Sequence, residues 1–335
     1  MHRAIPGGCH TYAKGDDQYP EFIAPLIVKG RGCRVWDADG NEYIEYGMGL
    51  RAVSLGHAYP SITAAVSRQL ELGSNYARPA VIELEAAETF LNMVPGADMV
   101  KFAKNGSDVV SAAIKLARAY TGRDKFAVCA DHPFFSVDDW FIATTPVNRG
   151  IPVADTELAL GFRYNDIESV KALFGEHEGE IACLIMEPEK NEPLSTAFVK
   201  ELQALCKTNG GLLILDEMIT GLRWDLGGAQ TLYDVVPDLS TFGKAMGNGF
   251  AVSALAGKRE IMQLGGLDHD EERVFLLSTT HGAESHSLAA FMAVVEEYRK
   301  MDVVGYFRYQ GERLRQGMQR LISENHLLDI FAVHG

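Results

Sequence analysis

The chain has 335 residues, of which 47% are hydrophobic and 23% are charged, which is the balance of a globular protein with material for one large domain or two ordinary ones. This balance excludes intrinsic disorder and the collagen-like or low-complexity classes. Lys and Arg number 31 against 45 Asp and Glu, a net charge of −14, so we expect no general affinity for nucleic acid or for an anionic membrane.

The five cysteines favour a reducing, cytoplasmic compartment. Their number is odd, they are widely spaced and they include no CxxC, which argues against disulfides and a zinc ribbon. The chain has no HExxH, and we predict no metal site. It shows neither a signal peptide nor an apolar run near the roughly 20 residues of a membrane span.

The elements follow in chain order. Residues 35–44 predict a hairpin whose turn is Asp-Gly-Asn, a looser segment follows at 47–51, and a helix is expected from Pro60. Apolar runs bounded by turn residues then alternate with helical periodicity, which predicts a largely parallel sheet covered on both faces, an α/β fold. The predicted strands are 126–129, 181–186, 212–215 and 252–256, and the predicted helices are 109–120, 167–174, 197–208, 284–298 and 303–322.

Functional side chains are expected just after these strands, because ligands bind at the carboxyl ends of parallel strands. Asp216 and Glu217 follow the run 212–215. An acid there can cap the next helix, pair with a buried heterocycle, or hold Mg²⁺ in a nucleotide-dependent enzyme. The last interpretation needs an upstream GxxxxGK[ST], whereas the chain has only a downstream Gly243-Lys244, followed by Ala245.

Two further segments add to the acid. Lys244 stands among glycines at 243–249, where a partly desolvated amine has a lowered pKa and is suited to Schiff-base chemistry. Gly106 and Ser107 open a predicted amphipathic helix, and its free N–H groups suit a phosphate, although a plain N-cap by Ser107 or Asp108 is the simpler alternative. Together these features meet the requirements of pyridoxal 5′-phosphate.

The chain resembles the class III, fold-type I pyridoxal-phosphate aminotransferases, and among them it is most similar to the glutamate-1-semialdehyde 2,1-aminomutase group. The resemblance runs from about residue 20 to the end and is carried by residues 36–46, 55–57, 105–108, 216–223 and 238–244. It implies a large domain with a mostly parallel seven-stranded sheet and a small α+β domain. The implied boundaries are 1–60 for the start of the small domain, 61–305 for the large domain and 306–335 for an incomplete C-terminal part, whose residues 330–333 resemble an opening strand.

The resemblance also implies roles at the cofactor ring. Lys244 forms the Schiff base and moves the proton, Asp216 pairs with the pyridinium nitrogen, and Met218 packs against the ring. The stacking aromatic of the family falls on Phe134, with Phe135 close behind it. The family's Glu-Pro segment places Glu187 and Asn191 near the site with weaker support.

At the phosphate, the resemblance assigns Gly106, Ser107 and Asp108, and it assigns to Thr279 a contact with the phosphate of the partner subunit in a homodimer. Arg51 lies where relatives line the substrate pocket, and an arginine there is suited to a substrate carboxylate or phosphate.

We therefore expect a pyridoxal-phosphate-dependent enzyme that transfers an amino group from an amino acid to an aldehyde or keto acceptor. Arg51 and the segment around Phe134 differ from the aminomutase pattern and favour this reaction. An intramolecular aminomutase reaction and a catalytically silent or truncated cofactor-binding relative remain alternatives. No nucleic acid or membrane partner is expected.

Overall fold

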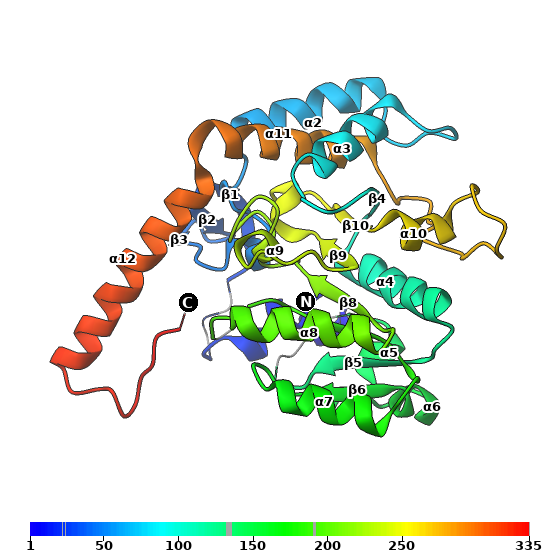
Figure 1. The fold of residues 1–335 in the computed structure, drawn as a ribbon. Coiled ribbons are helices and arrows are strands. Elements are labelled where there is room, and N and C mark those ends of the chain that lie inside the picture. Colours follow the sequence, from blue (N-terminus) through cyan, green and yellow to red (C-terminus); the bar gives the residue numbers. More distant parts are fainter. Residues whose placement is uncertain (22, 24, 132–135, 190–191, 335) are drawn as a thin grey trace.

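The computed structural model describes residues 1–21, 23, 25–131, 136–189 and 192–334. Its centre is a seven-stranded sheet in the order β4-β10-β9-β8-β7-β5-β6 (Figure 1). The strands are β4 (Met99–Ala103), β5 (Lys125–Cys129), β6 (Ala159–Phe162), β7 (Ile181–Met186), β8 (Leu212–Asp216), β9 (Leu239–Phe242) and β10 (Ser253–Gly257). The apolar runs predicted as strands are β5, β7, β8 and β10.

The sheet is mostly parallel, as the alternating pattern predicts. Only β10 runs against its neighbours, β4 and β9. Every residue of β7, β8 and β9 is buried, which explains why these segments read as continuous apolar runs rather than alternating ones. The register pairs Met186 with Leu215 and Asp216 with Thr241, so the residues that follow β7, β8 and β9 meet at one edge.

Helices cover both faces of the sheet. On one face, α4 (Gly106–Thr121) packs its buried side against the core of β5, β7 and β8. On the other face, α7 (Ile167–Glu176) and α8 (Thr196–Thr208) pack over β5–β8. Over β4, β9 and β10 lie α2 (Pro60–Leu72), α3 (Val81–Leu91) and α11 (Ser285–Met301) (Figure 1). The short helices are α5 (Asp139–Ile142), α6 (Val153–Glu157), α9 (Ala229–Leu232) and α10 (Arg259–Met262).

The N-terminal part forms a separate antiparallel sheet of β1 (Ile27–Arg31), β2 (Arg34–Asp37) and β3 (Glu42–Ile44). The predicted hairpin of residues 35–44 is confirmed as β2–β3. Asp37 is buried and accepts hydrogen bonds from the N–H groups of Asp39 and Asn41, which fixes the turn.

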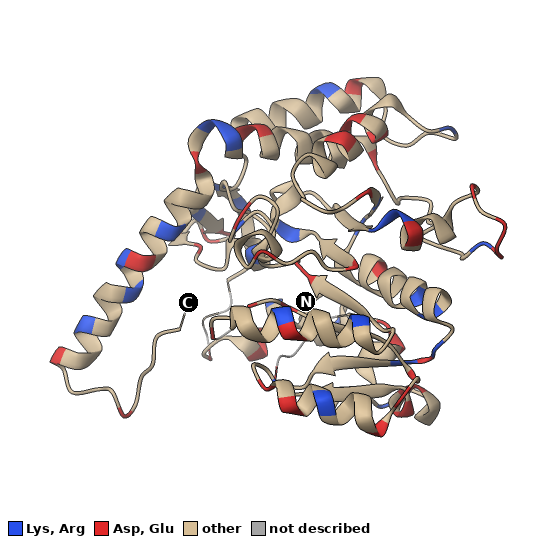
Figure 2. Cartoon of the chain, viewed as in Figure 1, with Lys and Arg blue, Asp and Glu red and all other residues tan. Residues whose placement is uncertain are grey.

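The chain then leaves the core along α12 (Val303–Glu324), a long helix of which only Val303 and Ile322 are buried (Figure 1). Acidic and basic residues are interspersed along it (Figure 2). The expected strand at 330–333 is wrong: residues 328–330 form a turn and 331–334 have no regular structure. In the described ranges no helix combines the length and the apolarity that a bilayer crossing requires.

Candidate active site

Three of the expected residues meet at the carboxyl edge of β7, β8 and β9. Glu187 follows β7, Asp216 ends β8, and Lys244 follows β9 after Gly243. Both carboxylates act electrostatically on the Lys244 ammonium, and Glu187 also acts on Asp216. Parallel pairing therefore assembles two acids and one amine from segments 57 residues apart in the sequence.

Asp216 is a buried carboxyl with a fixed orientation. Its Oδ1 accepts a 2.8 Å hydrogen bond from the Thr241 hydroxyl and a 3.0 Å bond from the Met218 N–H. Burial and the neighbouring Glu187 raise the pKa of Asp216 to about 7, although the two hydrogen bonds and Lys244 oppose this shift. Within the described part of the chain both hydrogen bonds of this carboxyl use Oδ1, which leaves Oδ2 available.

Lys244 begins a single 3₁₀ turn, Lys244–Gly247 (η4), with a φ of +43°. A non-glycine residue in this left-handed region is strained by about 1–2 kcal/mol, and such strain gathers at functional positions. Burial lowers the pKa of Lys244, while Asp216 and Glu187 act in the opposite direction. The backbone of Lys244 is thus held in an unfavourable conformation. Its side chain is partly desolvated, which favours the neutral amine.

Met218 connects the acid and the lysine to the start of α4. A Cβ added at Gly243 would lie 2.6 Å from the Met218 sulfur, and one added at Gly106 would lie 3.1 Å from it. The Met218 side chain, on the loop after Asp216, therefore lies close both to the turn that carries Lys244 and to the start of α4. Glycine is required at 243 for space, because its φ of −178° is open to any residue.

The N-terminus of α4 is organised for an anion. Asn105 is the N-cap: its side chain accepts from the Asp108 N–H, and the Asp108 carboxylate accepts from the Asn105 N–H. The cap is thus Asn105 rather than Ser107 or Asp108, and Asp108 is occupied in holding it. In the described structure the N–H groups of Gly106 and Ser107 have no acceptor, as is usual for first-turn N–H groups, which lack one within their own helix.

Glu217 has a structural role next to this site. It is fully buried and accepts 2.8 Å hydrogen bonds from the N–H groups of Ala229 and Gln230, at the start of α9. The Thr220 hydroxyl donates to it as well. Of the two consecutive acids, Glu217 therefore caps a helix, which is one of the roles that the sequence left open for this pair.

A strained segment reaches the site from the N-terminal part. Met48, Gly49, Leu50 and Arg51, which form α1 (Met48–Arg51), have φ values of +45°, +56°, +59° and +67°. The Glu45 carboxylate accepts the Gly49 N–H at 2.9 Å, and the exposed Arg51 is close enough to act on the Lys244 charge.

Asn248 ties this N-terminal segment to the lysine turn. Its side chain accepts the Leu55 N–H at 2.8 Å and donates to the Gly56 carbonyl at 3.0 Å. It follows Lys244–Gly247 directly, so one buried amide sets the position of the segment that carries Arg51 against the turn that carries Lys244.

The other expected residues are Thr279, Ser107, Phe134 and Asn191. Thr279 is exposed, and its hydroxyl lies close to Gly282, which is near the end of β4. Ser107 accepts the Val137 N–H at 3.1 Å. Phe134 and Asn191 lie outside the described residues.

The residues present fit pyridoxal 5′-phosphate. A doubly held carboxyl leaves one oxygen for a ring cation, a desolvated lysine stands on the neighbouring strand end, and free N–H groups open α4 beside a glycine. Met218 supplies an apolar surface between them. The described ranges contain no group of three or more His, Cys, Asp or Glu placed to hold a metal ion.

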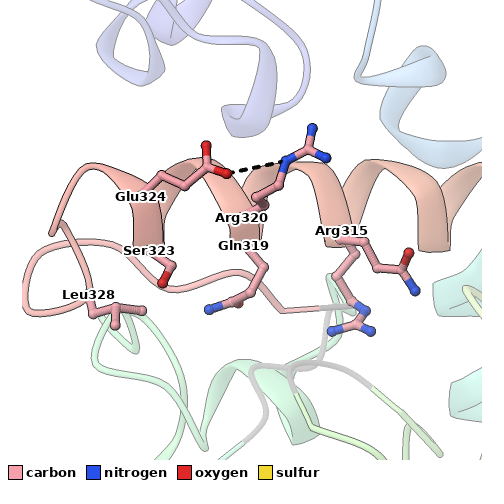
Figure 3. Close-up of a pocket in the computed structure, with 7 residues that line it drawn as sticks. Arg315, Gln319, Arg320, Ser323, Glu324 and Leu328 are labelled. Carbon is pink, nitrogen blue, oxygen red and sulfur yellow. Dashed lines mark ion pairs between the residues drawn. The ribbon is translucent and has the colours of Figure 1, made fainter.

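A surface pocket lies well apart from this cluster, along α12. It is lined by Arg315, Gln319, Arg320, Ser323, Glu324 and Leu328, among others, and Arg320 pairs with Glu324 across one helical turn (Figure 3). None of the candidate residues lines it.

Sequence reasoning gave no role to three residues that hold the site together: Thr241, Asn248 and Arg223, whose guanidinium donates to the Arg51 carbonyl. Thr241 and Asn248 act only through contacts between distant segments, which leave no local pattern. Arg223 did carry a signal, because it follows a largely apolar stretch, 218–222, that is otherwise buried.

Comparisons with known proteins agree with this geometry. The sequence model of the family described as aminotransferase class-III matches residues 12–332. Glutamate-1-semialdehyde 2,1-aminomutase of Acetivibrio thermocellus is 34% identical over 331 residues, covering 95% of this chain and 77% of that protein. The protein of the same name from Methanosphaera stadtmanae is 37% identical over 270 residues, covering 77% of this chain but only 63% of its own length.

Solved structures are similar over nearly the whole chain. An omega-transaminase from Sphaerobacter thermophilus gives a TM-score of 0.88 at 29% identity and covers 96% of this chain and 76% of that one. The FumI protein of Sphingopyxis sp. MTA144, solved in its pyridoxal-phosphate internal aldimine form, gives a TM-score of 0.87 at 28% identity, covering 96% of this chain and 77% of that one.

Proposed function

The chain belongs to the class-III aminotransferase family of pyridoxal-phosphate-dependent enzymes, and we propose that it transfers an amino group from an amino acid to a separate aldehyde or keto acceptor. The observation that carries this proposal is the cluster at the strand ends. A lysine whose pKa is lowered by burial and a carboxyl held by Thr241 follow neighbouring strands, and Met218 lies close both to Gly243 of the lysine turn and to Gly106 at the start of α4. When bound there, pyridoxal 5′-phosphate supplies the electron sink that stabilises a carbanion.

Each residue then has a distinct task. Lys244 Nζ takes and returns the proton at the substrate α-carbon, because the partly dry site favours its neutral form. Asp216 Oδ2 holds a proton on the ring nitrogen, since an opposite charge within about 4–6 Å favours the charged form of a group. The N–H groups of Gly106 and Ser107 bind the phosphate at the positive end of α4, and Met218 keeps water from the ring.

Aminomutase chemistry is the second candidate, because the relatives from A. thermocellus and M. stadtmanae are named for it. The two reactions differ in what leaves the protein. A transaminase releases a keto product after each half-reaction, whereas an aminomutase keeps both substituents on one molecule.

The deciding experiment incubates the protein first with one amino donor alone and then with a keto acceptor alone. Transamination gives stoichiometric keto acid in the first step and a new amino acid in the second. Efficient conversion of glutamate-1-semialdehyde to 5-aminolevulinate, with no external donor consumed, contradicts transamination and establishes the aminomutase reaction.

We also propose a homodimer with shared sites, in the cytoplasm. Thr279 is exposed in the single chain, as a residue that serves a partner's site would be. All five cysteines are free, which suits a reducing compartment. The family resemblance supports domain boundaries at residues 60 and 305, and the antiparallel β1–β3 sheet lies before the first of them.

A further inference from the structure

Two serines near the start of α4 hold the segment that leads into α5. Ser107 and Ser111 are four residues apart and therefore share one face of the helix. The Ser107 hydroxyl oxygen accepts the Val137 N–H at 3.1 Å. One turn further along, the Ser111 hydroxyl donates to the Asp138 carboxylate and accepts the Trp140 Nε1–H at 2.7 Å. The segment is thus attached to the end of α4 that we assign to the cofactor phosphate.

The Ser111 hydroxyl connects this segment to the hydrophobic core. Trp140 is buried, and its ring packs edge-on against Phe126 of β5 with 5.2 Å between ring centroids. The indole N–H that reaches Ser111 therefore comes from a ring held by packing. Because the same hydroxyl donates to Asp138, the core sets the position of Asp138 and, with it, of the neighbouring Val137.

The contact between Val137 and Ser107 is not explained by side-chain packing. Val137 is 79% exposed, so the position of its N–H depends on the bonds of the next residue, Asp138. A hydroxyl has one donor hydrogen and two acceptor lone pairs. The Val137 N–H occupies one lone pair, and within the described ranges the Ser107 hydroxyl donates to no protein acceptor. The bond from Val137 therefore restricts the direction in which Ser107 can donate.

We propose that Ser111 and Asp138 are positioning residues for the cofactor phosphate, with Trp140 as their support in the core. Through the Val137 N–H they orient the Ser107 hydroxyl, which then donates to a phosphate oxygen. The proposal rests on the proposed function, because that function assigns the phosphate to this end of α4. Hydrogen bonds to an ionised acceptor are stronger than neutral ones, so the orientation of this one hydroxyl should matter for binding.

Charge alone gives the opposite expectation for Asp138. An acid near a bound phosphate repels it, so removal of the acid should strengthen phosphate binding. If Asp138 acts instead by holding the segment in place, its removal should weaken binding. The sign of the effect in Asp138→Ala therefore separates positioning from charge.

The test compares two ligands that differ in the phosphate group. The protein freed of cofactor is titrated with pyridoxal 5′-phosphate and with pyridoxal, followed by visible absorbance and equilibrium dialysis. We expect Ser111→Ala and Asp138→Ala each to weaken pyridoxal-phosphate binding about three- to tenfold and to leave pyridoxal binding unchanged. Ser111→Thr, which keeps a hydroxyl, should bind both ligands as the wild type does. Thr121→Ala is the matched control, because it removes a hydroxyl that donates within the same helix, to the Ala117 carbonyl at 2.7 Å.

A second arm removes the serine through which the effect should act. In a Ser107→Ala background, Ser111→Ala should cost little further affinity, because the hydroxyl that it orients is gone. Losses that simply add in the double variant overturn the proposal. If Ser111→Ala does not fold, Asp138→Ala with and without Ser107→Ala decides the same question.

Three other results would also overturn the proposal. They are unchanged pyridoxal-phosphate affinity in folded Ser111→Ala, tighter binding by Asp138→Ala, and equal losses for the two ligands, which would mean that the network serves the ring or the fold. A wild type that binds pyridoxal as tightly as pyridoxal 5′-phosphate has no phosphate site and refutes it too. A wild type that shows the expected pattern but transfers no amino group retains the positioning network and refutes only the proposed function.

Discussion

The hydroxyl of Thr241 donates a 2.8 Å hydrogen bond to Oδ1 of Asp216, across the paired strands β9 and β8. The strand that leads to the lysine therefore orients the carboxyl on its neighbour. This bond favours the ionised carboxylate, while burial and Glu187 favour the protonated acid. The balance leaves the pKa of Asp216 at about 7.

Asp216 should consequently make the stability of the cofactor-free protein depend on pH. Its pKa is about 7 when folded against 3.8 for an ordinary Asp. The stabilising protonated form is fully available below pH 3.8 and is lost as the pH rises through 7. The free energy of unfolding of wild type relative to Asp216→Asn should thus fall by up to about 1.4 kcal/mol per pH unit in this window.

Urea unfolding of both proteins at several pH values between 4 and 8 measures this difference in the free energy of unfolding. Glu217, whose pKa is also raised to about 7, is present in both and cancels. Thr241→Val should move the window to higher pH, because it removes a bond that lowers the pKa. A difference that stays constant with pH would contradict the assignment.

Lys244→Ala should leave the fold intact and abolish covalent cofactor attachment, because the side chain lies in a turn at the sheet edge. Borohydride reduction followed by peptide mapping should label Lys244 in the wild type and no lysine in the variant. Lys200→Ala, which removes an exposed lysine paired with Asp234, is the control and should label normally. Labelling of any other lysine in the wild type would refute the role of Lys244.

Gly243→Ala should destabilise the protein by about 1–3 kcal/mol and weaken cofactor retention, because the new methyl would lie 2.6 Å from the Met218 sulfur. Relative to Met218→Ala alone, the same glycine change should cost much less stability, since the clashing atom is gone. Gly175→Ala serves as the control: no atom lies within 4 Å of a Cβ there. Thermal denaturation of the four proteins tests the coupling, and equal losses in Gly243→Ala with and without Met218→Ala would show that the contact is unimportant.

Thr279→Ala should weaken cofactor retention across the dimer interface. Heterodimers of Thr279→Ala and Lys244→Ala protomers, purified through two different tags, would then contain one site with both changes and one with neither. We expect about half the wild-type activity per dimer. Activity no higher than that of the Thr279→Ala homodimer would mean that Thr279 serves its own subunit or none.

Much of this site followed from the sequence because parallel strands impose it. The runs at 181–186 and 212–215 indicated adjacent strand ends, and any residues just beyond them, such as Glu187 and Asp216, had to lie at one edge. The contacts of Asn248 with Leu55 and Gly56 span more than 190 residues, and no local periodicity encodes them.

The C-terminal misprediction has a different cause. Residues 330–333 are apolar and resemble a strand, but strand formation depends on a partner and a surface to pack on. In the described structure they follow α12 without a neighbouring strand. The left-handed backbone of Met48–Arg51 could not be predicted from the sequence either. Only Gly49 is a residue that favours positive φ, and the other three residues rarely adopt it.

The amide of Asn248 has a consequence for how such a protein can be altered. It secures Leu55 and Gly56, while Glu45 holds the Gly49 N–H, so residues 50–52 lie between two attachments that do not depend on their own side chains. A library that randomises only Leu50, Arg51 and Ala52 should therefore yield proteins with new substrate preferences that still load the cofactor. Such a result would mean that substrate preference and cofactor loading depend on different segments of the chain.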